Sequence, residues 1–304
     1  MLSCTGKRKM INVSLGIFAY NEEKNIGQLL QAVEEQVLKK VELKEIIVVS
    51  SASTDRTDDI VREYEKKDPR IKLIIQNERK GKSSAINLFL KEATGDVLII
   101  ESADTIPAKN TIEKLTVPFY DESIGMTGGR PEPINNPKSF IGFAVCMMWH
   151  LHHKMAMISP KIGEMASFRN IVKEIPEHSP VDEASIESII THDGLKLKYV
   201  PDAIVHNKGP ENVSDFIKQR RRIYTGHLWL QENQDYTVVS QNSGLIIGLT
   251  IKEFSLNPIK DMKIIYTILL EIWGRFLGWY DYKILKKIPY KWDISESTKD
   301  LSKS

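Results

Sequence analysis

A short apolar strand followed at once by polar side chains is the first sign of chemistry in this chain. Residues 97–100 form an apolar run too short for a helix and bounded by a glycine and a proline, which predicts a buried strand. Ser102 and Asp104 follow at its carboxyl end, where open α/β sheets bind their ligands. A carboxylate there can hold a divalent cation, which in turn holds a diphosphate. The alternative is that Asp104 only caps the next helix.

Two further clusters carry charge in patterns that chemistry can use. Asp182 and Glu183 stand side by side at the predicted start of a helix. A carboxylate at this end of a helix is stabilised by the helix dipole and can also act as a general base. The segment 218–222 holds one lysine and three arginines, and guanidinium groups bind a diphosphate bidentately. A solvated helix face is the alternative for this basic segment.

The elements that must position these groups alternate between strands and helices. Helices are predicted to follow the first three strands, beginning near residues 21, 55 and 81. Strands separated by helical segments of about 10–15 residues indicate βαβ units and a parallel sheet. This pattern predicts a nucleotide-binding type of α/β domain with polar residues at its carboxyl edge. The predicted strands are residues 11–18, 44–49, 72–75, 97–100, 124–129, 195–200 and 201–206.

Composition narrows the class of protein. The chain of 304 residues is 41% hydrophobic and 27% charged, which is ordinary for a protein with a sizeable core. A net charge of +2 gives no general attraction to nucleic acid, so we expect no nucleic-acid partner. Cys4 and Cys146 provide no disulfide framework and suit a reducing compartment. We recognise no signal peptide and no run of ~18 apolar residues, and therefore expect a cytoplasmic location.

Several short segments, taken in order, resemble family-2 glycosyltransferases of the GT-A fold. The resemblance covers about residues 11–230 and implies a mixed, mainly parallel α/β sheet flanked by helices. The residues that follow it are expected, from their own pattern, to form a C-terminal helical appendage. In that family the first two loops hold the nucleoside, the lysine segment lies along the donor, and an Asp-x-Asp motif binds ribose and metal. The matching segments are Ala19-Tyr20-Asn21-Glu22-Glu23, Ser53-Thr54-Asp55-Arg56-Thr57, Gly81-Lys82 with Asn87, Ala103-Asp104, and Tyr199-Val200-Pro201-Asp202-Ala203.

The resemblance implies a donor site that departs from the family pattern at two places. Ser50-Ser51-Ala52 stands where the family usually has Asp-Asp-Gly, which leaves a hydroxyl to accept the base N–H. Ser102 replaces the first Asp of Asp-x-Asp, which leaves Asp104 as the main ligand of Mg²⁺ or Mn²⁺. The implied donor-binding residues are Ala19, Tyr20, Asn21, Glu22, Ser50, Ser51, Gly81, Lys82, Ser102, Ala103, Gly163, Gln219, Arg220 and Arg222.

The same resemblance implies the catalytic and leaving-group residues. The acidic pair resembles the family's Glu-Asp motif in reversed order, so the catalytic base is either Glu183 or Asp182. The basic segment resembles the Gln-x-x-Arg-Trp motif of members that act at membranes, with Ile223 in place of Trp, which favours single transfer over polymer synthesis. His206 lies one position from the place where some GT-A enzymes supply a late His to the metal. It is the second metal candidate, with a strand-end histidine as the alternative.

The C-terminal part lies outside the resemblance. Residues 262–280 carry an aromatic stripe flanked by lysines, which fits a helix in the plane of a membrane surface. The alternative is a helix that packs on the catalytic domain. We therefore expect a catalytic domain at residues 1–235, with a donor half at about 11–130 and an acceptor half at about 131–235. A helical segment at 236–304 follows and ends in a polar tail after about Asp293.

Together these features predict an inverting, metal-dependent glycosyltransferase. It would move a sugar from a UDP- or GDP-linked donor to a lipid-linked or glycan acceptor, as a peripheral protein on the inner face of the cell membrane. A rival interpretation is a non-catalytic sugar-nucleotide-binding or scaffold protein of the same fold, which the serines at positions 50, 51 and 102 favour. A nucleotidyltransferase is disfavoured because the chain lacks a Gly-rich first loop for a triphosphate.

Overall fold

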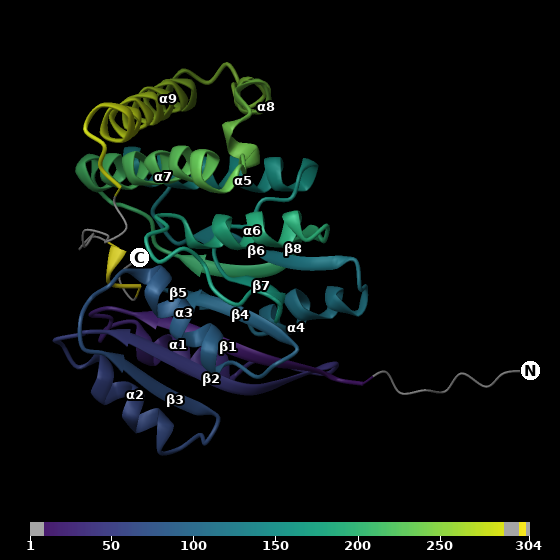
Figure 1. Ribbon diagram of the computed structural model, residues 1–304. Helices are drawn as coiled ribbons and strands as arrows, with labels where there is room; N and C mark the ends of the chain where they lie inside the picture. Colours follow the sequence, from purple (N-terminus) through teal and green to yellow (C-terminus); the bar gives the residue numbers. More distant parts are fainter. Residues whose placement is uncertain (1–8, 289–297, 302–304) are drawn as a thin grey trace, which may run out of the picture.

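The computed structural model describes residues 9–288 and 298–301, and these residues form one eight-stranded sheet with helices around it (Figure 1). The strand order is β3-β2-β1-β4-β7-β6-β8-β5. Strands β1 to β4 run parallel, β6 runs parallel to β8, and β7 and β5 are antiparallel to their neighbours. The predicted mixed, mainly parallel sheet is confirmed. The strands are β1 (Ile11–Ala19), β2 (Val41–Ser51), β3 (Ile71–Gln76), β4 (Val97–Ser102), β5 (Thr105–Pro107), β6 (Ile124–Pro133), β7 (Ala166–Arg169) and β8 (Lys196–Asn207).

Helices cover both faces of the sheet, because strands such as β1 and β4 are apolar on both sides. On one face Leu15 and Ile17 pack with α1, α2 and α4. On the other face Phe18 packs with α3 and α6. Gly16 lies under Phe89 of α3, whose ring would stand only 2.7 Å from a Cβ at this position. These helices are α1 (Ile26–Glu34), α2 (Thr57–Glu65), α3 (Lys82–Glu92), α4 (Thr111–Thr116) and α6 (Asp182–His192), with a short 3₁₀ turn, η1 (Val117–Tyr120).

The remaining helices form a separate layer beyond α6, in which α8 and α9 lie over α5 and α7 (Figure 1). Helix α9 packs closely along α7 because it presents glycines to it. A Cβ at Gly278 would lie 2.5 Å from the Arg221 carbonyl oxygen, and one at Gly274 would lie 2.6 Å from Arg220 Cβ. The predicted C-terminal helix is thus present, and its inner face packs on the catalytic part. The elements are α5 (Phe140–Ile158), α7 (Val213–Gln234), η2 (Val239–Gln241), α8 (Ser243–Ile251), α9 (Pro258–Trp279) and the π-helical turn η3 (Tyr280–Ile284).

The outer face of α9 carries a row of exposed apolar side chains. Trp273 and Phe276 stack with ring centroids 5.6 Å apart, and Phe276 and Trp279 follow at 6.1 Å. Within residues 9–288 and 298–301, none of the helices combines the length and apolar character that a membrane crossing needs. Most of the predicted polar tail lies outside the described residues. We call the row of exposed apolar side chains on α9 the α9 stripe. It comprises Ile265, Leu269, Ile272, Trp273, Phe276 and Trp279.

Three details of the sheet differ from the sequence prediction. The two strands expected at residues 195–200 and 201–206 form the single strand β8, because a register shift against β6 between Gly128 and Arg130 accommodates the irregular middle of the pair. No strand was predicted at residues 166–169, which form β7, or directly after Asp104. The segment after Asp104 forms the short strand β5, in which Thr105 pairs with Asn207 of β8.

Candidate functional site

A continuous cavity of about 1230 Å³ lies at the carboxyl ends of β1, β2 and β4 and extends beneath α7, α8 and α9. Its position matches the crevice that the sequence predicts. Five of the residues predicted for the site do not line it, namely Asn21, Ser50, Ala103, Asp182 and His206. The predicted residues that line it are Ala19, Tyr20, Glu22, Ser51, Gly81, Lys82, Ser102, Asp104, Gly163, Glu183, Gln219, Arg220 and Arg222.

Asn21 and Ser50 shape the first two loops instead of facing the cavity. Asn21 has a left-handed backbone (φ 52), which asparagine tolerates better than most residues. Its Oδ1 accepts a hydrogen bond from Thr54 N at 2.8 Å, and its own N–H donates to Ser53 Oγ at 3.1 Å. Ser50 Oγ donates to the same Ser53 Oγ at 2.9 Å. These bonds tie the loop after β1 to the loop after β2 and thereby hold the cavity wall.

The wall next to these loops includes one predicted residue, Ser51, and one that sequence reasoning missed, Arg79. Ser51, which lines the cavity, donates its hydroxyl to Gln76 Oε1 at 2.8 Å. The Arg79 guanidinium stands 4.1 Å from the centre of the Tyr20 ring, a cation–π distance. Arg79 also lines the cavity. Its place only two residues before Gly81 was the one signal that could have identified it.

The C-terminal segment 298–301 packs against the first loop. Lys299 Nζ donates to the Tyr20 carbonyl oxygen at 2.7 Å and forms an ion pair with Glu22. Asn25 holds the segment from below, because its Nδ2 donates to Lys299 O at 3.1 Å and its Oδ1 accepts from Leu301 N at 3.1 Å. Burial, with repulsion from Asp104, raises the pKa of Glu22 to about 7, and Lys299 acts against that rise. No sequence pattern indicated this contact across the whole length of the chain.

Carboxylate and amide oxygens gather where β4 and β8 end and β5 begins. Asp104 lines the cavity together with Asn207, whose Oδ1 is buried without a hydrogen-bond partner. Asn207 Nδ2 donates to Glu164 Oε1 at 3.4 Å. Burial, followed by repulsion from Asp104 and Glu183, raises the pKa of Glu164 to about 7. Carboxylate and amide oxygens fit Mg²⁺ or Mn²⁺, although no cluster of three acidic, histidine or cysteine side chains suited to a metal occurs among the described residues.

His206 is not part of this cluster, so its assignment as a metal ligand is corrected. Side chains alternate along a strand, and β8 therefore directs Asn207 to the cavity and its neighbour His206 away from it. Asn207 is the residue that stands at the expected place.

The acidic pair begins α6 and meets the lysine that begins α3. Lys82 Nζ lies 2.8 Å from Glu183 Oε1 and 3.1 Å from Asp182 Oδ2. Asp182 is fully buried and accepts a hydrogen bond from Ser83 Oγ at 3.2 Å, whereas Glu183 faces the cavity with a quarter of its side chain exposed. Of the two candidates for the base, only Glu183 is thus placed to meet a ligand.

The pKa values of Asp182 and Glu183 are shifted in opposite directions. Burial raises the pKa of Asp182 above its ordinary value, against the attraction of Lys82. Burial acts in the same direction on Glu183, but Lys82 outweighs it and lowers the pKa of Glu183. Burial also opposes the charge on Lys82, yet Glu183 and Asp182 raise the pKa of Lys82 above its ordinary value. Glu183 is therefore ionised at neutral pH, as a general base must be.

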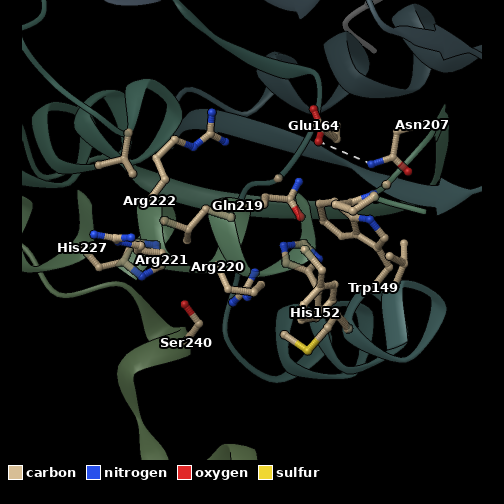
Figure 2. Close-up of a pocket in the computed structure, with 18 of the residues that line it drawn as sticks. Trp149, His152, Glu164, Asn207, Gln219, Arg220, Arg221, Arg222, His227 and Ser240 are labelled. Atoms are coloured by element: carbon tan, nitrogen blue, oxygen red, sulfur yellow. Dashed lines mark hydrogen bonds between the residues drawn. The ribbon is translucent and has the colours of Figure 1, made fainter. Parts of the chain in front are cut away.

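Helix α7 supplies the basic side of the cavity. Gln219 and Arg222 are three residues apart and share one face of the helix. Figure 2 shows both side chains extending toward the side where Glu164 lies. Burial lowers the pKa of Arg222, and the nearby carboxylates, led by Asp182 and Glu183, oppose this effect.

Arg220 lies on a different face of α7, rotated by about 100° from Gln219. Its guanidinium forms an ion pair with Glu271 of α9, with Nη2 donating to Oε1 at 2.9 Å. Arg222, and not Arg220, is thus the arginine that the structure brings to the acidic pair.

A cavity at the carboxyl edge of a parallel sheet, with an ionised carboxylate facing basic groups, defines a nucleotide-binding type of α/β enzyme. The family model described as "Glycosyl transferase family 2" matches residues 14–166. The chain therefore belongs to glycosyl transferase family 2, and its class is that of the glycosyltransferases.

Curated relatives agree with this membership. The probable glycosyltransferase YdaM of Bacillus subtilis (strain 168) is 31% identical over 245 residues, which are 75% of this chain and 56% of the relative. The poly-beta-1,6-N-acetyl-D-glucosamine synthase of Staphylococcus aureus (strain COL) is 26% identical over 216 residues, 67% of this chain and 51% of the relative. The chain thus spans about half the length of these relatives.

Among solved structures, the mannosyltransferase PcManGT from Pyrobaculum calidifontis, in complex with GDP-Man and Mn²⁺, superimposes with a TM-score of 0.61. The identity is 20%, and the match covers 93% of this chain and 83% of that one. This similarity confirms the predicted GT-A fold.

Proposed function

We propose that this protein is an inverting, metal-dependent glycosyltransferase that uses a UDP- or GDP-linked sugar. The observation that carries the proposal is the placement of Glu183. This ionised carboxylate faces the cavity, is held 2.8 Å from Lys82, and shares the cavity with Asp104 and Arg222. A base, a candidate cation ligand and a leaving-group cation that line one cavity are the parts that direct sugar transfer requires.

In the proposed sugar transfer, Glu183 acts as the base, and Arg222 and Gln219 stabilise the leaving group. Glu183 takes the proton from an acceptor hydroxyl, and the hydroxyl oxygen forms a bond to the anomeric carbon of the donor sugar. The bond from that carbon to the diphosphate breaks on the opposite face, and the diphosphate leaves with the electron pair, which inverts the configuration. Arg222 and Gln219 donate hydrogen bonds to the departing diphosphate as its charge develops.

A divalent cation would be held by Asp104 and Asn207. The buried Asn207 Oδ1, which has no hydrogen-bond partner, supports this placement because buried polar atoms are seldom left unpaired. When bound, the cation would neutralise the diphosphate charge. The mannosyltransferase from Pyrobaculum calidifontis, which contains Mn²⁺ with its nucleotide sugar, is consistent with Mn²⁺ or Mg²⁺ here.

The acceptor in this proposal is lipid-linked or a glycan, and the protein works at the inner face of the cell membrane. The α9 stripe supports this location, since its stacked aromatic side chains are of the kind that insert at a membrane interface. We expect the protein to sediment with vesicles of phosphatidylethanolamine and phosphatidylglycerol, and the variant Trp273→Ser with Phe276→Ser to remain in solution. Equal sedimentation of both proteins would refute the location.

Calorimetric titration with UDP and with GDP, each with and without Mn²⁺, tests the donor half of the proposal. We expect one nucleotide to bind in a metal-dependent manner, and Asp104→Ala to abolish that dependence. Failure of both nucleotides to bind to a folded sample would overturn the proposal.

The catalytic half is tested with Glu183→Gln against Glu177→Gln, an exposed glutamate in the loop before α6. Glu183→Gln should keep nucleotide affinity and lower transfer by at least about a hundredfold, the usual contribution of a general base. Glu177→Gln should transfer normally. Full activity in Glu183→Gln would remove this residue as the base.

A non-catalytic sugar-nucleotide-binding protein is the second candidate, favoured by Ser50 and Ser51 where the family usually has carboxylates. Nucleotide binding without transfer to any lipid or glycan acceptor, in the wild-type protein, would support it.

A further inference from the structure

The cavity is also lined by side chains of α7, η2, α8 and α9 that the proposed chemistry does not use, and we treat this part of it as a second arm. Arg220 and His227 enter this arm from α7, Ser240 from η2, and Arg275 from α9. In Figure 2, Arg220, His227 and Ser240 lie on the side of the close-up away from Glu164 and Asn207. Lys161, in the loop after α5, lines the same arm. We call it the acceptor arm.

The acceptor arm carries an excess of positive charge. Arg220 and Arg275 share the single carboxylate of Glu271, with Arg275 Nε donating to Oε1 at 2.7 Å and Arg220 Nη2 donating to the same atom at 2.9 Å. Against the effect of burial, the two guanidinium groups lower the pKa of Glu271 to about 2. Lys161 makes no hydrogen bond or ion pair within the described part of the chain. Two cations are therefore balanced by one anion, and a third cation is left over.

The other carboxyl near Lys161 compensates this charge only in part. Glu187 accepts hydrogen bonds from Ile162 N at 2.8 Å and from the Tyr236 hydroxyl at 3.1 Å. Burial raises the pKa of Glu187 to about 7 despite the attraction of Lys161, which weakens its negative charge near neutral pH. Burial also lowers the pKa of Lys161, with Glu187 opposing and Arg220 and Arg275 adding to the effect. A bound anion would relieve this repulsion.

Two polar side chains in the acceptor arm have no partner among the described residues. The His227 ring is 8% exposed and forms no hydrogen bond there, and Ser240 Oγ is buried without one. Burial, with Lys161 and Arg220 nearby, lowers the pKa of His227 well below its ordinary value, so the ring is neutral. A neutral imidazole and a hydroxyl that lack partners are groups that an oxygen-rich ligand would satisfy.

Beyond these polar groups the wall becomes apolar. Helix α8 contributes Ile246, Ile247 and Leu249, and α9 contributes Ile268 and Ile272. Ile247 and Ile272 are also more than half exposed, and Ile272 belongs to the α9 stripe. The acceptor arm therefore joins a cationic interior to the apolar outer face of the helical layer.

We propose that the acceptor arm binds the phosphate of a lipid-linked acceptor, with the phosphate on Lys161, Arg275 and His227 and the hydrocarbon chain between α8 and α9. This inference rests on the proposed function and names its acceptor class as a phosphate-bearing lipid. The phosphate is a binding group, and the hydroxyl that receives the sugar lies on the Glu183 side of it. Charge complementarity argues for this ligand, because a neutral lipid would leave the spare cation and the unpaired polar atoms unsatisfied.

Octyl phosphate is a soluble probe for the acceptor arm, with octyl glucoside and inorganic phosphate as probes of the tail and of the anion alone. We expect octyl phosphate to bind the full-length protein saturably, in calorimetry, and at least about tenfold more tightly than either control. Equal binding of octyl glucoside would reduce the site to an apolar surface. Equal binding of inorganic phosphate would make it a site for free anions. Either result overturns the proposal.

Single-residue variants test whether octyl phosphate binds in the acceptor arm. Lys161→Gln should weaken octyl phosphate about tenfold, the value of one hydrogen bond to a charged group. His227→Phe, which keeps the ring volume, should weaken it roughly three- to tenfold. The matched control is Lys252→Gln, at the exposed end of α8, which should change nothing. Unchanged affinity in both Lys161→Gln and His227→Phe would overturn the proposal.

Nucleotide titration of the same samples separates this inference from the proposed function. We expect the nucleotide and octyl phosphate to bind together, since they occupy different arms of the cavity, and competition between them would place octyl phosphate in the donor site and overturn the inference. Octyl phosphate binding without nucleotide binding would support the acceptor arm while removing the transferase. Nucleotide binding without octyl phosphate binding would leave the transferase and remove the acceptor arm.

Discussion

Replacing Lys82 with methionine is the most direct test of the electrostatics around the base. The methionine keeps the apolar length of the side chain and removes the ammonium that lies 2.8 Å from Glu183 and 3.1 Å from Asp182. Asp182 is fully buried and only a quarter of the Glu183 side chain is exposed. Breaking a buried pair by removing one partner typically costs 3–5 kcal/mol, because a charge is left uncompensated. Since Glu183 keeps some contact with solvent, we expect a loss of about 3 kcal/mol in the free energy of unfolding at pH 8.

The loss should depend on pH in a defined direction. Without Lys82, burial dominates and the pKa of Glu183 rises above its unfolded value of 4.5. The folded variant then binds more protons than the unfolded chain between about pH 4.5 and the raised pKa, so its stability falls as the pH rises. Arg222 and Glu164 also face these groups. The charge of Arg222 limits the rise in the pKa of Glu183, and the charge of Glu164 adds to it. As the pH falls to 5, protonation of these carboxyls removes part of the uncompensated charge, and the loss should shrink to about 1 kcal/mol.

Urea unfolding of the wild type and of Lys82→Met at pH 5 and pH 8 measures both values. Lys80→Met, which removes an exposed lysine two residues away, should cost less than about 0.5 kcal/mol at either pH. Adding Glu183→Gln to Lys82→Met should recover part of the loss at pH 8, because one of the two uncompensated carboxylates is gone while the buried Asp182 remains. A loss of the same size at both pH values would refute the reasoning.

Three further perturbations test other parts of the structure. Glu187→Gln should stabilise the protein by up to about 3 kcal/mol at pH 8 and not at pH 4. The reason is that a buried carboxyl whose pKa is raised to about 7 destabilises the fold as the pH rises above its unfolded pKa. Urea unfolding as a function of pH measures this effect, and a loss of stability at pH 8 would contradict it. Gly278→Ala should cost about 1–3 kcal/mol by forcing a Cβ against the Arg221 carbonyl oxygen, whereas Gly248→Ala in α8, where a Cβ meets nothing within 4 Å, should be neutral or stabilising; equal melting temperatures for the two variants would argue against the close α7–α9 contact. Asn25→Ala should speed amide exchange at residues 298–301 without changing exchange in β1, since Asn25 provides two hydrogen bonds to that segment, and unchanged exchange would show that other contacts hold it.

Much of the donor half could be predicted from local pattern. The apolar runs of β1, β2, β3 and β4 are short and bounded by turn residues, so their type and order could be inferred from the sequence alone. Because parallel strands end at a common edge, the polar residues that follow them were expected to meet, and Tyr20, Ser51 and Asp104 do line one cavity. The resemblance to family-2 glycosyltransferases added the identities of the loops.

The sequence left choices between neighbouring residues that only the tertiary structure decided. Asp182 and Glu183 differ by one position, which on a helix is a rotation of about 100°, and packing of α6 on α3 buries the first and turns the second to the cavity. The same rotation separates Arg222 from Arg220 on α7. On β8 one position reverses the side-chain direction, so Asn207 faces the cavity. The periodic pattern of a sequence identifies the neighbouring candidates but does not show which of them faces the cavity.

The contacts that complete the site join parts of the chain far apart in sequence. Lys82 meets Glu183 from 101 residues away, and Lys299 meets Glu22 from 277 residues away. Composition and local pattern determined that this protein has an α/β sheet with a polar carboxyl edge and an amphipathic C-terminal helix. Only the tertiary structure decided which carboxylate is ionised, which cation it faces and how far the cavity extends beneath α7, α8 and α9. These properties depend on burial and on distances between segments that are far apart in sequence.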